Sequence, residues 1–423
     1  MEVVKINDNI SLRYIEMDKL KTTSVSVFIH RPLKDADASY NALLPMVLKS
    51  GTELCPDRAA IARYLDDLYG ASMGVATMKC GEDHVMYFDS ETISDKYAPE
   101  GEPLVADLLR LLMSVLFAPK TADGVFDEKV TEIEKKNAID KIMAFINDKR
   151  QYASTRCQQE TARGTAFAIN RLGDSAVIKE ITSSELYEYY KSIITASVID
   201  IYICGSTDIN TAVSAVKEYT DKLDFTAAQL PKTDILSREE GNIHQVTEEM
   251  DVAQGKLAMG FITNVKPTDP DYDALVVFNS VFGAGAHSKL FNNVREKLSL
   301  AYYASSQLER FKGMIIVNAG IEFENFQKAY DETLAQLEEI RNGNISEHEF
   351  SSSKIALINN YRSFYDDQRA MASTSMMNRV AGRDRSVEEL IADIEKVTIE
   401  DIVAVSKKLQ LDTSYFLKGK GAE

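Results

Sequence analysis

The chain has 423 residues, of which 45% are hydrophobic and 27% are charged, and its formal net charge is −17. That length suits two or three domains, and no apolar run approaches the roughly 20 residues of a membrane span. The negative charge argues against nucleic acid or an anionic membrane as a partner, because phosphates attract basic patches. The four cysteines are far apart in the sequence, which is typical of reduced thiols. The N-terminal segment does not have the pattern of a signal peptide. We therefore expect a cytoplasmic protein.

The first half of the sequence alternates predicted strands and helices. Near-alternation of apolar and polar residues predicts a strand pair over 11–29 and a hairpin over 75–88. Apolar residues at helical spacing, with glycine or proline at the ends, predict helices over 41–50, 56–69 and 104–117. A long amphipathic helix is expected from Phe126 to about Cys157, and Asn147-Asp148 could divide it.

An internal repeat indicates the domain organisation. The segment 182–185 reads as a capping box that opens a helix, and a strand pattern ending at Gly205 follows it. The segment 398–401 is an acidic cap of the same kind, and the strand pattern after it ends at Gly419. Since the second half repeats the order of the first, the chain resembles a duplication.

The predicted fold class is α+β, with two similar domains that are each an antiparallel sheet with helices packed on one face. We expect the N-terminal domain over 1–226 and the C-terminal domain over 242–423. The polar segment 227–241 carries Pro231 and is the predicted linker.

The segment 288–303 contains the first candidate site. Its apolar residues recur at helical spacing on one face, at positions 290, 291, 294 and 298. The next apolar run, 300–308, predicts a strand, so Tyr302 would lie across a helix-to-strand corner from Arg295. A guanidinium and a phenol hydroxyl both donate hydrogen bonds and suit a peptide carbonyl. Alternatively, Arg295 is a solvated helix-end cation and Tyr302 a half-buried strand residue.

This segment, SKLFNNVREKLSLAYY, resembles the signature S-R-L-F-x-x-[LV]-R-E-K-x-G-L-A-Y of the insulinase-like (pitrilysin, inverzincin) family of zinc metallopeptidases. The resemblance extends over essentially the whole chain and includes QGKLAMGF and GMIIVNAG in the second half. It implies a fold of two duplicated α+β halves, and it implies that Arg295 and Tyr302 bind the backbone of a peptide substrate. The signature glycine is Ser299 here, a departure that could stiffen the corner.

The catalytic half of the family's site is missing from the sequence. Active members carry H-x-x-E-H, in which the two histidines bind zinc and the glutamate is the general base. The resemblance aligns these three positions with Asn41, Leu44 and Pro45. The third zinc ligand aligns with Lys141, or with Asp140 if the alignment shifts by one. Leucine and proline side chains have no lone pair to donate and a lysine repels a metal, so we expect no metal and no other cofactor in this chain.

Other chemistry has weaker support in the sequence. The five histidines are scattered, and no two of them are four or five residues apart. His84 is expected to be satisfied by local hydrogen bonds, as a lone histidine usually is. No complete nucleotide-binding glycine motif and no local nucleophile–histidine motif is present.

The sequence therefore predicts half of a peptidase site. Our leading hypothesis is a noncatalytic, substrate-binding subunit of a heterodimeric zinc metallopeptidase. Its partners would be a homologous H-x-x-E-H subunit, which holds the zinc, and a peptide. The alternative is a peptidase-derived scaffold or interaction protein with no proteolytic role, and an enzyme of another class is the third reading. Fold alone does not choose among these.

Overall fold

The computed structural model describes residues 1–238 and 241–421, and these form two compact units. Unit 1 comprises Met1–Ile142, Ile169–Lys232 and Phe364–Val380. Unit 2 comprises Met143–Ala168, Thr233–Ser363 and the described part of Ala381–Glu423. The change at Lys232 falls within the predicted linker 227–241, of which positions 239 and 240 lie outside the described residues, as do positions 422 and 423 at the end of the predicted C-terminal domain.

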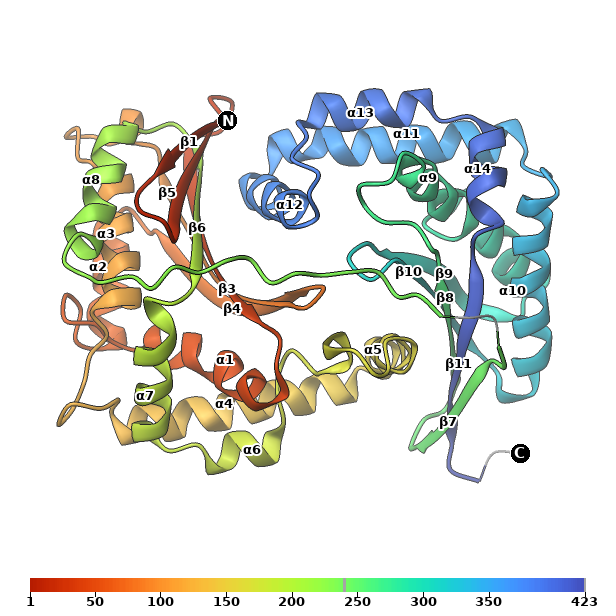
Figure 1. The fold of residues 1–423 in the computed structure, drawn as a ribbon, viewed down its shortest axis with the longest axis horizontal. Helices are drawn as coiled ribbons and strands as arrows, with labels where there is room; N and C mark the ends of the chain where they lie inside the picture. Colours follow the sequence, from red (N-terminus) through yellow and green to blue (C-terminus); the bar gives the residue numbers. More distant parts are fainter. Residues whose placement is uncertain (239–240, 422–423) are drawn as a thin grey trace. The chain divides into compact units, whose positions relative to one another are not determined.

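Unit 1 contains a six-stranded sheet in the order β1-β2-β6-β3-β5-β4 (Figure 1). All neighbours are antiparallel except β2 and β6, which run parallel. Parallel pairing needs a long crossover, which the chain between β2 and β6 supplies. The strands are β1 (Glu2–Lys5), β2 (Ile10–Glu16), β3 (Thr22–Pro32), β4 (Ser72–Cys80), β5 (Asp83–Ile93) and β6 (Val198–Gly205).

The helices of unit 1 cover this sheet, with α3 and α8 on one side and α12 on the other (Figure 1). α3 is buried along almost its whole length, as its apolar sequence predicts. The predicted capping box is present at the start of α7, where the side chains and backbone of Thr182 and Glu185 bond reciprocally. The helices are α1 (Asp35–Leu48), α2 (Arg58–Asp67), α3 (Leu104–Phe117), α4 (Glu128–Asn147), α6 (Ser175–Glu180), α7 (Ser183–Ile194), α8 (Ile209–Thr220) and α12 (Gln368–Val380), with short 3-10 turns at Asp95–Tyr97 and Phe364–Asp366.

Unit 2 contains a five-stranded sheet in the order β7-β11-β8-β10-β9. Again one pair, β7 with β11, is parallel and the others are antiparallel. The two units thus share the predicted α+β plan, and each adds one parallel pair to it. The strands are β7 (His244–Met250), β8 (Gly255–Ile262), β9 (Ala301–Glu309), β10 (Met314–Ile321) and β11 (Gln410–Gly419).

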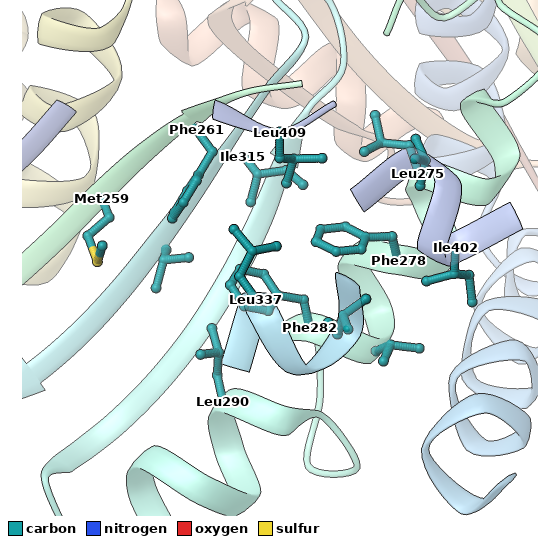
Figure 2. Packing of buried hydrophobic residues seen from close by; sticks show 14 of the residues in the cluster. Met259, Phe261, Leu275, Phe278, Phe282, Leu290, Ile315, Leu337, Ile402 and Leu409 are labelled. Carbon is teal, nitrogen blue, oxygen red and sulfur yellow. The ribbon is translucent and has the colours of Figure 1, made fainter. Parts of the chain in front are cut away.

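The core of unit 2 forms where the apolar faces of β8 and β10 meet α9 and α10 (Figure 2). Phe278 and Phe282 of α9 stack with ring centroids 5.4 Å apart, and Phe261 of β8 meets Phe282 edge to face at 6.3 Å. The helices are α5 (Lys149–Thr161), α9 (Tyr272–Phe282), η3 (Leu290–Lys297), α10 (Phe326–Arg341), α11 (Glu347–Ser363), α13 (Val387–Lys396) and α14 (Ile399–Ser406), with 3-10 turns at Ala166–Ala168 and Phe323–Asn325. The acidic cap predicted at 398–401 is a capping box at the start of α14.

Two helices pack in the other unit from most of their half of the sequence: α5, from the first half, belongs to unit 2, and α12, from the second half, belongs to unit 1. The break predicted near Asn147-Asp148 is present, because Asp148 caps the start of α5. Beyond it, α5 packs on β8, β10 and β11 of unit 2, while α12 packs on β3 and β6 of unit 1. The compact units are therefore not continuous in sequence, unlike the predicted domains 1–226 and 242–423.

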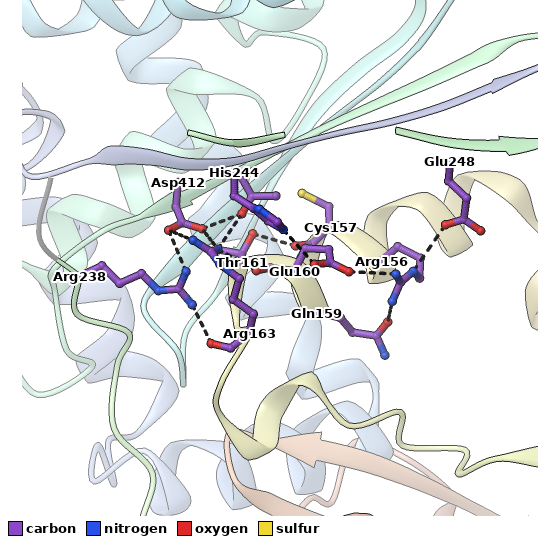
Figure 3. Close-up of polar contacts among 11 residues, drawn as sticks. Arg156, Cys157, Gln159, Glu160, Thr161, Arg163, Arg238, His244, Glu248 and Asp412 are labelled. Atoms are coloured by element: carbon purple, nitrogen blue, oxygen red, sulfur yellow. Dashed lines mark hydrogen bonds and ion pairs between the residues drawn. The ribbon is translucent and has the colours of Figure 1, made fainter. Parts of the chain in front are cut away.

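A polar network attaches the α5 region to the sheet of unit 2 (Figure 3). Asp412 of β11 accepts from Arg163 at 2.6 Å and from Arg238 at 3.1 Å. At the end of α5, Glu160 lies 3.1 Å from the His244 imidazole. Because Asp412 is mostly buried, the bonds from Arg163 are less screened than those of a surface pair.

One glycine sets the distance between α5 and the sheet. A side chain at Gly260 of β8 would collide with Thr161, which is fully buried and donates to Cys157 O at 2.7 Å. The helix and the strand can approach this closely only because Gly260 has no Cβ.

Among the described residues, no helix combines the length and the apolar character that a membrane crossing requires.

Candidate functional site

The helix before the predicted corner is a π-helix, η3. Its wider turn shows in the bond from Leu298 N to Asn293 O, which spans five residues at 3.1 Å. Leu290 and Val294 are buried as predicted, but Leu298 is 45% exposed, so its assignment to the apolar face was wrong. An α-helical spacing places position 298 on that face, and the wider π-turn does not. π-helical turns are rare and occur frequently at functional sites.

Side-chain contacts fix η3 against two helices of unit 2. Lys289, at the start of η3, lies 3.1 Å from the Glu349 carboxylate of α11, and both are largely buried. Asn293 donates to Gln336 Oε1 of α10 at 2.7 Å. The corner therefore rests on a rigid support, which a binding site needs.

Arg295 lies on the exposed side of η3, and its side chain is 40% exposed. The guanidinium lies 4.6 Å from the Phe291 ring centroid, and its Nε lies 3.5 Å from the Glu296 carboxylate. The ring orients the guanidinium by a cation–π contact and leaves its donors accessible.

Ser299 makes the turn between η3 and β9 with φ = 52°. This left-handed conformation is the one that glycine adopts at no steric cost, and the family signature has glycine at this position. The departure from the signature thus retains the turn and adds backbone strain to it.

Tyr302 is placed by a β-bulge. The register between β9 and β10 shifts between Gly320 and Ile321, which leaves Tyr302 as the extra residue. A bulge redirects a side chain, and the Tyr302 side chain here is 53% exposed. Its hydroxyl donates to the Glu322 carboxylate, and this hydrogen bond raises the pKa of Tyr302.

The predicted pair thus shares one corner, since η3 packs directly on β9. In the described residues, no hydrogen bond or ring contact joins Arg295 to Tyr302. Their role in substrate binding stays a prediction.

β9 is an edge strand of its sheet, with β10 as its neighbour. On the other side of β9, the backbone at Gly283 occupies part of the edge, because Ser306 N donates to Gly283 O at 3.0 Å. A Cβ at Gly283 would lie 2.6 Å from Ser306 N, so this approach requires glycine. Within the described chain, no strand pairs with the outer side of β9 near Tyr302.

The zinc-motif positions lie in unit 1, where Asn41 is part of a buried polar chain. Its amide nitrogen lies 3.2 Å from His84 Nδ1, and its amide oxygen accepts from the Tyr189 hydroxyl at 2.7 Å. His84 Nε2 lies 3.0 Å from Arg171 O. Burial lowers the pKa of His84 to about 4, so the imidazole is neutral and donates from Nε2 to the carbonyl.

The other three zinc-motif positions cannot supply metal ligands. Leu44 is 1% exposed and Pro45 is also buried, both inside α1. α4 does bring Lys141 beside α1, with its Nζ 3.8 Å from Met46 Sδ, but an ammonium repels a cation. No group of three His, Cys, Asp or Glu side chains suited to a metal occurs in the described parts of the chain. The zinc that the family uses does not fit these residues.

A second buried network in unit 1 has no counterpart in the sequence analysis. His30 Nδ1 lies 2.6 Å from Asp83 and its Nε2 lies 3.2 Å from Asp200, which also pairs with Arg379 of α12. Burial opposes the charged imidazole, but the two carboxylates outweigh it and raise the pKa of His30 to about 9. These residues are far apart in sequence and form no local motif, so no sequence signal could have grouped them.

Comparison with known proteins identifies the family. The probable inactive metalloprotease YmfF of Bacillus subtilis (strain 168) is 35% identical over 418 residues, which are 99% of this chain and 98% of that protein. The chain belongs to the M16, or insulinase-like, peptidase family. Within this M16 chain, residues 180–357 match the family described as "Peptidase M16 inactive domain".

Solved structures share the fold of this M16 chain. A conserved protein from Enterococcus faecalis V583 is similar with a TM-score of 0.91 and 30% identity. The match covers 100% of this chain and 99% of the E. faecalis chain. The peptidase M16 inactive domain from Pseudomonas fluorescens has a TM-score of 0.78 at 17% identity, covering 99% and 98%, and shows the fold alone. The predicted fold of two similar α+β domains and the predicted membership of a subgroup without the zinc motif are both confirmed.

Proposed function

We propose that this M16 chain is the noncatalytic, substrate-binding subunit of a cytoplasmic, heterodimeric zinc metallopeptidase, paired with a homologue that carries H-x-x-E-H. One contrast within the chain carries the proposal. Arg295 and Tyr302 are exposed at a supported corner, while Asn41, Leu44 and Pro45 are buried and lack the zinc ligands. A chain that bound peptide but left the chemistry to its partner would have this distribution.

The corner supports binding of an extended peptide. An added strand would bond to the free side of β9 near Tyr302, since main-chain bonds at a sheet edge give affinity without demanding one sequence. Arg295 would donate hydrogen bonds from its rigid guanidinium to a peptide carbonyl. The Tyr302 hydroxyl would release the Glu322 carboxylate and donate to a second peptide carbonyl. The net charge of −17 favours cationic peptides.

A scaffold without a proteolytic role is the second candidate, and a specific observation favours it. Arg295 already stacks on Phe291, and Tyr302 already bonds to Glu322. Both side chains thus have local partners that would account for them as parts of the corner's own structure.

The test compares cleavage of an unstructured cationic peptide by this chain, by the H-x-x-E-H homologue from the same genome, and by their mixture. Zinc content is measured in each sample. We expect chelator-sensitive cleavage that is strong only in the mixture. Arg295→Ala should lower kcat/KM of the mixture about 10- to 100-fold, as for loss of a hydrogen bond to a charged donor.

Lys297→Ala is the matched control, because Lys297 is an exposed cation on the same helix. It should leave cleavage unchanged, whereas Tyr302→Phe should weaken it. Equal cleavage by the homologue alone and by the mixture would contradict the proposal, as would full activity with Arg295→Ala and Tyr302→Phe combined. A silent mixture would favour the scaffold.

A further inference from the structure

A pocket of about 550 Å³ lies within unit 1, where the C-terminal end of α1, α2, the edge strand β4 and α4 meet. This volume is in the range of small-molecule sites. Lys141, at one of the degenerate zinc-motif positions, is among its lining residues. One position that the resemblance aligns with a zinc ligand therefore contributes a cation to this pocket.

More cationic than anionic side chains line this pocket. Its lining contains three cations, Lys49, Arg58 and Lys141, and one carboxylate, Glu134. Glu134 is only 3% exposed, pairs with Arg58 and accepts from Ser50 Oγ at 3.0 Å. The single carboxylate is therefore already used by its own neighbours.

Two ammonium groups remain without a carboxylate partner in the described residues. Lys141 Nζ contacts Met46 Sδ, a weak acceptor, and the half-buried Lys49 has no hydrogen-bond acceptor among the residues that the structure describes. Burial, together with the nearby Arg58 and Lys141 cations, lowers the pKa of Lys49. In a chain whose net charge is −17, these two lysines make a local cationic site that an anion would stabilise.

The rest of the wall is apolar. Side chains from α1, α2 and β4 form it, namely Met46, Ile61, Leu65, Met73 and Val75. A phosphate would meet this wall with strongly hydrated oxygens, at a desolvation cost that the wall cannot offset. A ligand with one anionic end and an apolar body would use both parts of the pocket.

We propose that this pocket binds a carboxylate that carries an apolar group, with the carboxylate between Lys49 and Lys141 and the apolar group against α2 and β4. A free medium-chain carboxylic acid and the C-terminal residue of a peptide both present this chemistry. The site lies in unit 1, and its occupancy does not depend on the proposed role of Arg295 and Tyr302.

The test is isothermal titration of the full chain with four probes. Hexanoate and 1-hexanol share the apolar body and differ in charge. A pentapeptide ending in leucine is used with a free and with an amidated C-terminus. We expect binding of hexanoate, of the free-carboxylate peptide, or of both, and none of the neutral counterparts. Binding of hexanoate assigns a free acid, and binding of the peptide alone assigns a chain terminus.

Lys141→Met and Lys49→Met keep an unbranched side chain that is one atom shorter, and they remove the charge. Each should weaken binding at least tenfold, and Lys136→Met, an exposed lysine on the same helix, should not. Unchanged circular dichroism and Tm exclude misfolding as the cause. The proposal is overturned if no carboxylate probe binds, if 1-hexanol binds as tightly as hexanoate, or if the double variant retains full affinity.

Discussion

Tyr189 donates its hydroxyl to Asn41 Oδ1 at 2.7 Å, at the position that the family resemblance aligns with the first zinc-binding histidine of active members. The other end of the same amide faces His84, whose second nitrogen is used by Arg171 O. Asn41 is thus a structural link between α1, β5 and α7. Asn41 therefore has a part in the packing of unit 1 that needs no metal.

Asn41→Leu should therefore destabilise the protein, although the two side chains have the same branching and the same number of heavy atoms. It leaves His84 Nδ1 and the Tyr189 hydroxyl without their partner, at about 1–3 kcal/mol for each buried group. Urea unfolding followed by circular dichroism measures the loss. Tyr189→Phe leaves one buried group, Asn41 Oδ1, without its donor, so it should cost about 1–3 kcal/mol and less than Asn41→Leu. Equal stability of Asn41→Leu and the wild type would show that the link contributes nothing.

The His30 network predicts a pH dependence of stability. The pKa of His30 is about 9 in the fold, above its ordinary value of 6.5. A raised folded-state pKa contributes stability that is fully present below pH 6.5 and is lost as pH rises through about 9. The free energy of unfolding should thus fall between pH 6.5 and 9.5, and His30→Asn should remove that component. His348→Asn, at an exposed histidine, should retain it; an unchanged slope in His30→Asn would refute the assignment.

Ser299→Gly should stabilise the corner. The left-handed φ of 52° costs a non-glycine residue roughly 1–2 kcal/mol, and the added freedom of glycine in the unfolded chain offsets part of this. We expect a gain of about 0.5 kcal/mol in thermal or urea unfolding. Ser299→Ala retains the strained conformation and should give no gain. A loss of stability in Ser299→Gly would mean that the serine side chain matters more than the backbone.

Gly260→Ala should weaken the attachment of α5 to the sheet of unit 2. The new methyl group would collide with Thr161, and such overpacking costs about 1–3 kcal/mol. Faster amide exchange in α5, measured by mass spectrometry, would locate the effect. Gly74→Ala is the matched control, because that strand glycine has an open environment with its nearest atom 4.0 Å away. Similar exchange in both variants would argue against the close approach.

Local patterns predicted the elements of this fold well, for reasons visible in individual residues. Thr182 and Glu185 form their capping box within one turn, and Asp148 ends α4 by capping α5. The π-turns of η3 were missed because Leu298 has the spacing of an α-helix, and only the bonds across five residues distinguish the two.

Contacts between residues far apart in the chain could not be predicted from local sequence patterns. The placement of α5 depends on Gly260 with Thr161 and on Asp412 with Arg163, pairs that no local pattern connects. The candidate site residues Arg295 and Tyr302 were proposed from a contiguous signature. The cations around Lys141 come from three separate helices, so a pocket was not foreseen there.

The exchange of α5 and α12 between the two units has a consequence for how the chain can be divided. A protease that nicks the linker yields two pieces, and each piece retains a helix that completes the other's sheet. The nicked pieces should therefore copurify, and each expressed alone should expose one unprotected sheet face.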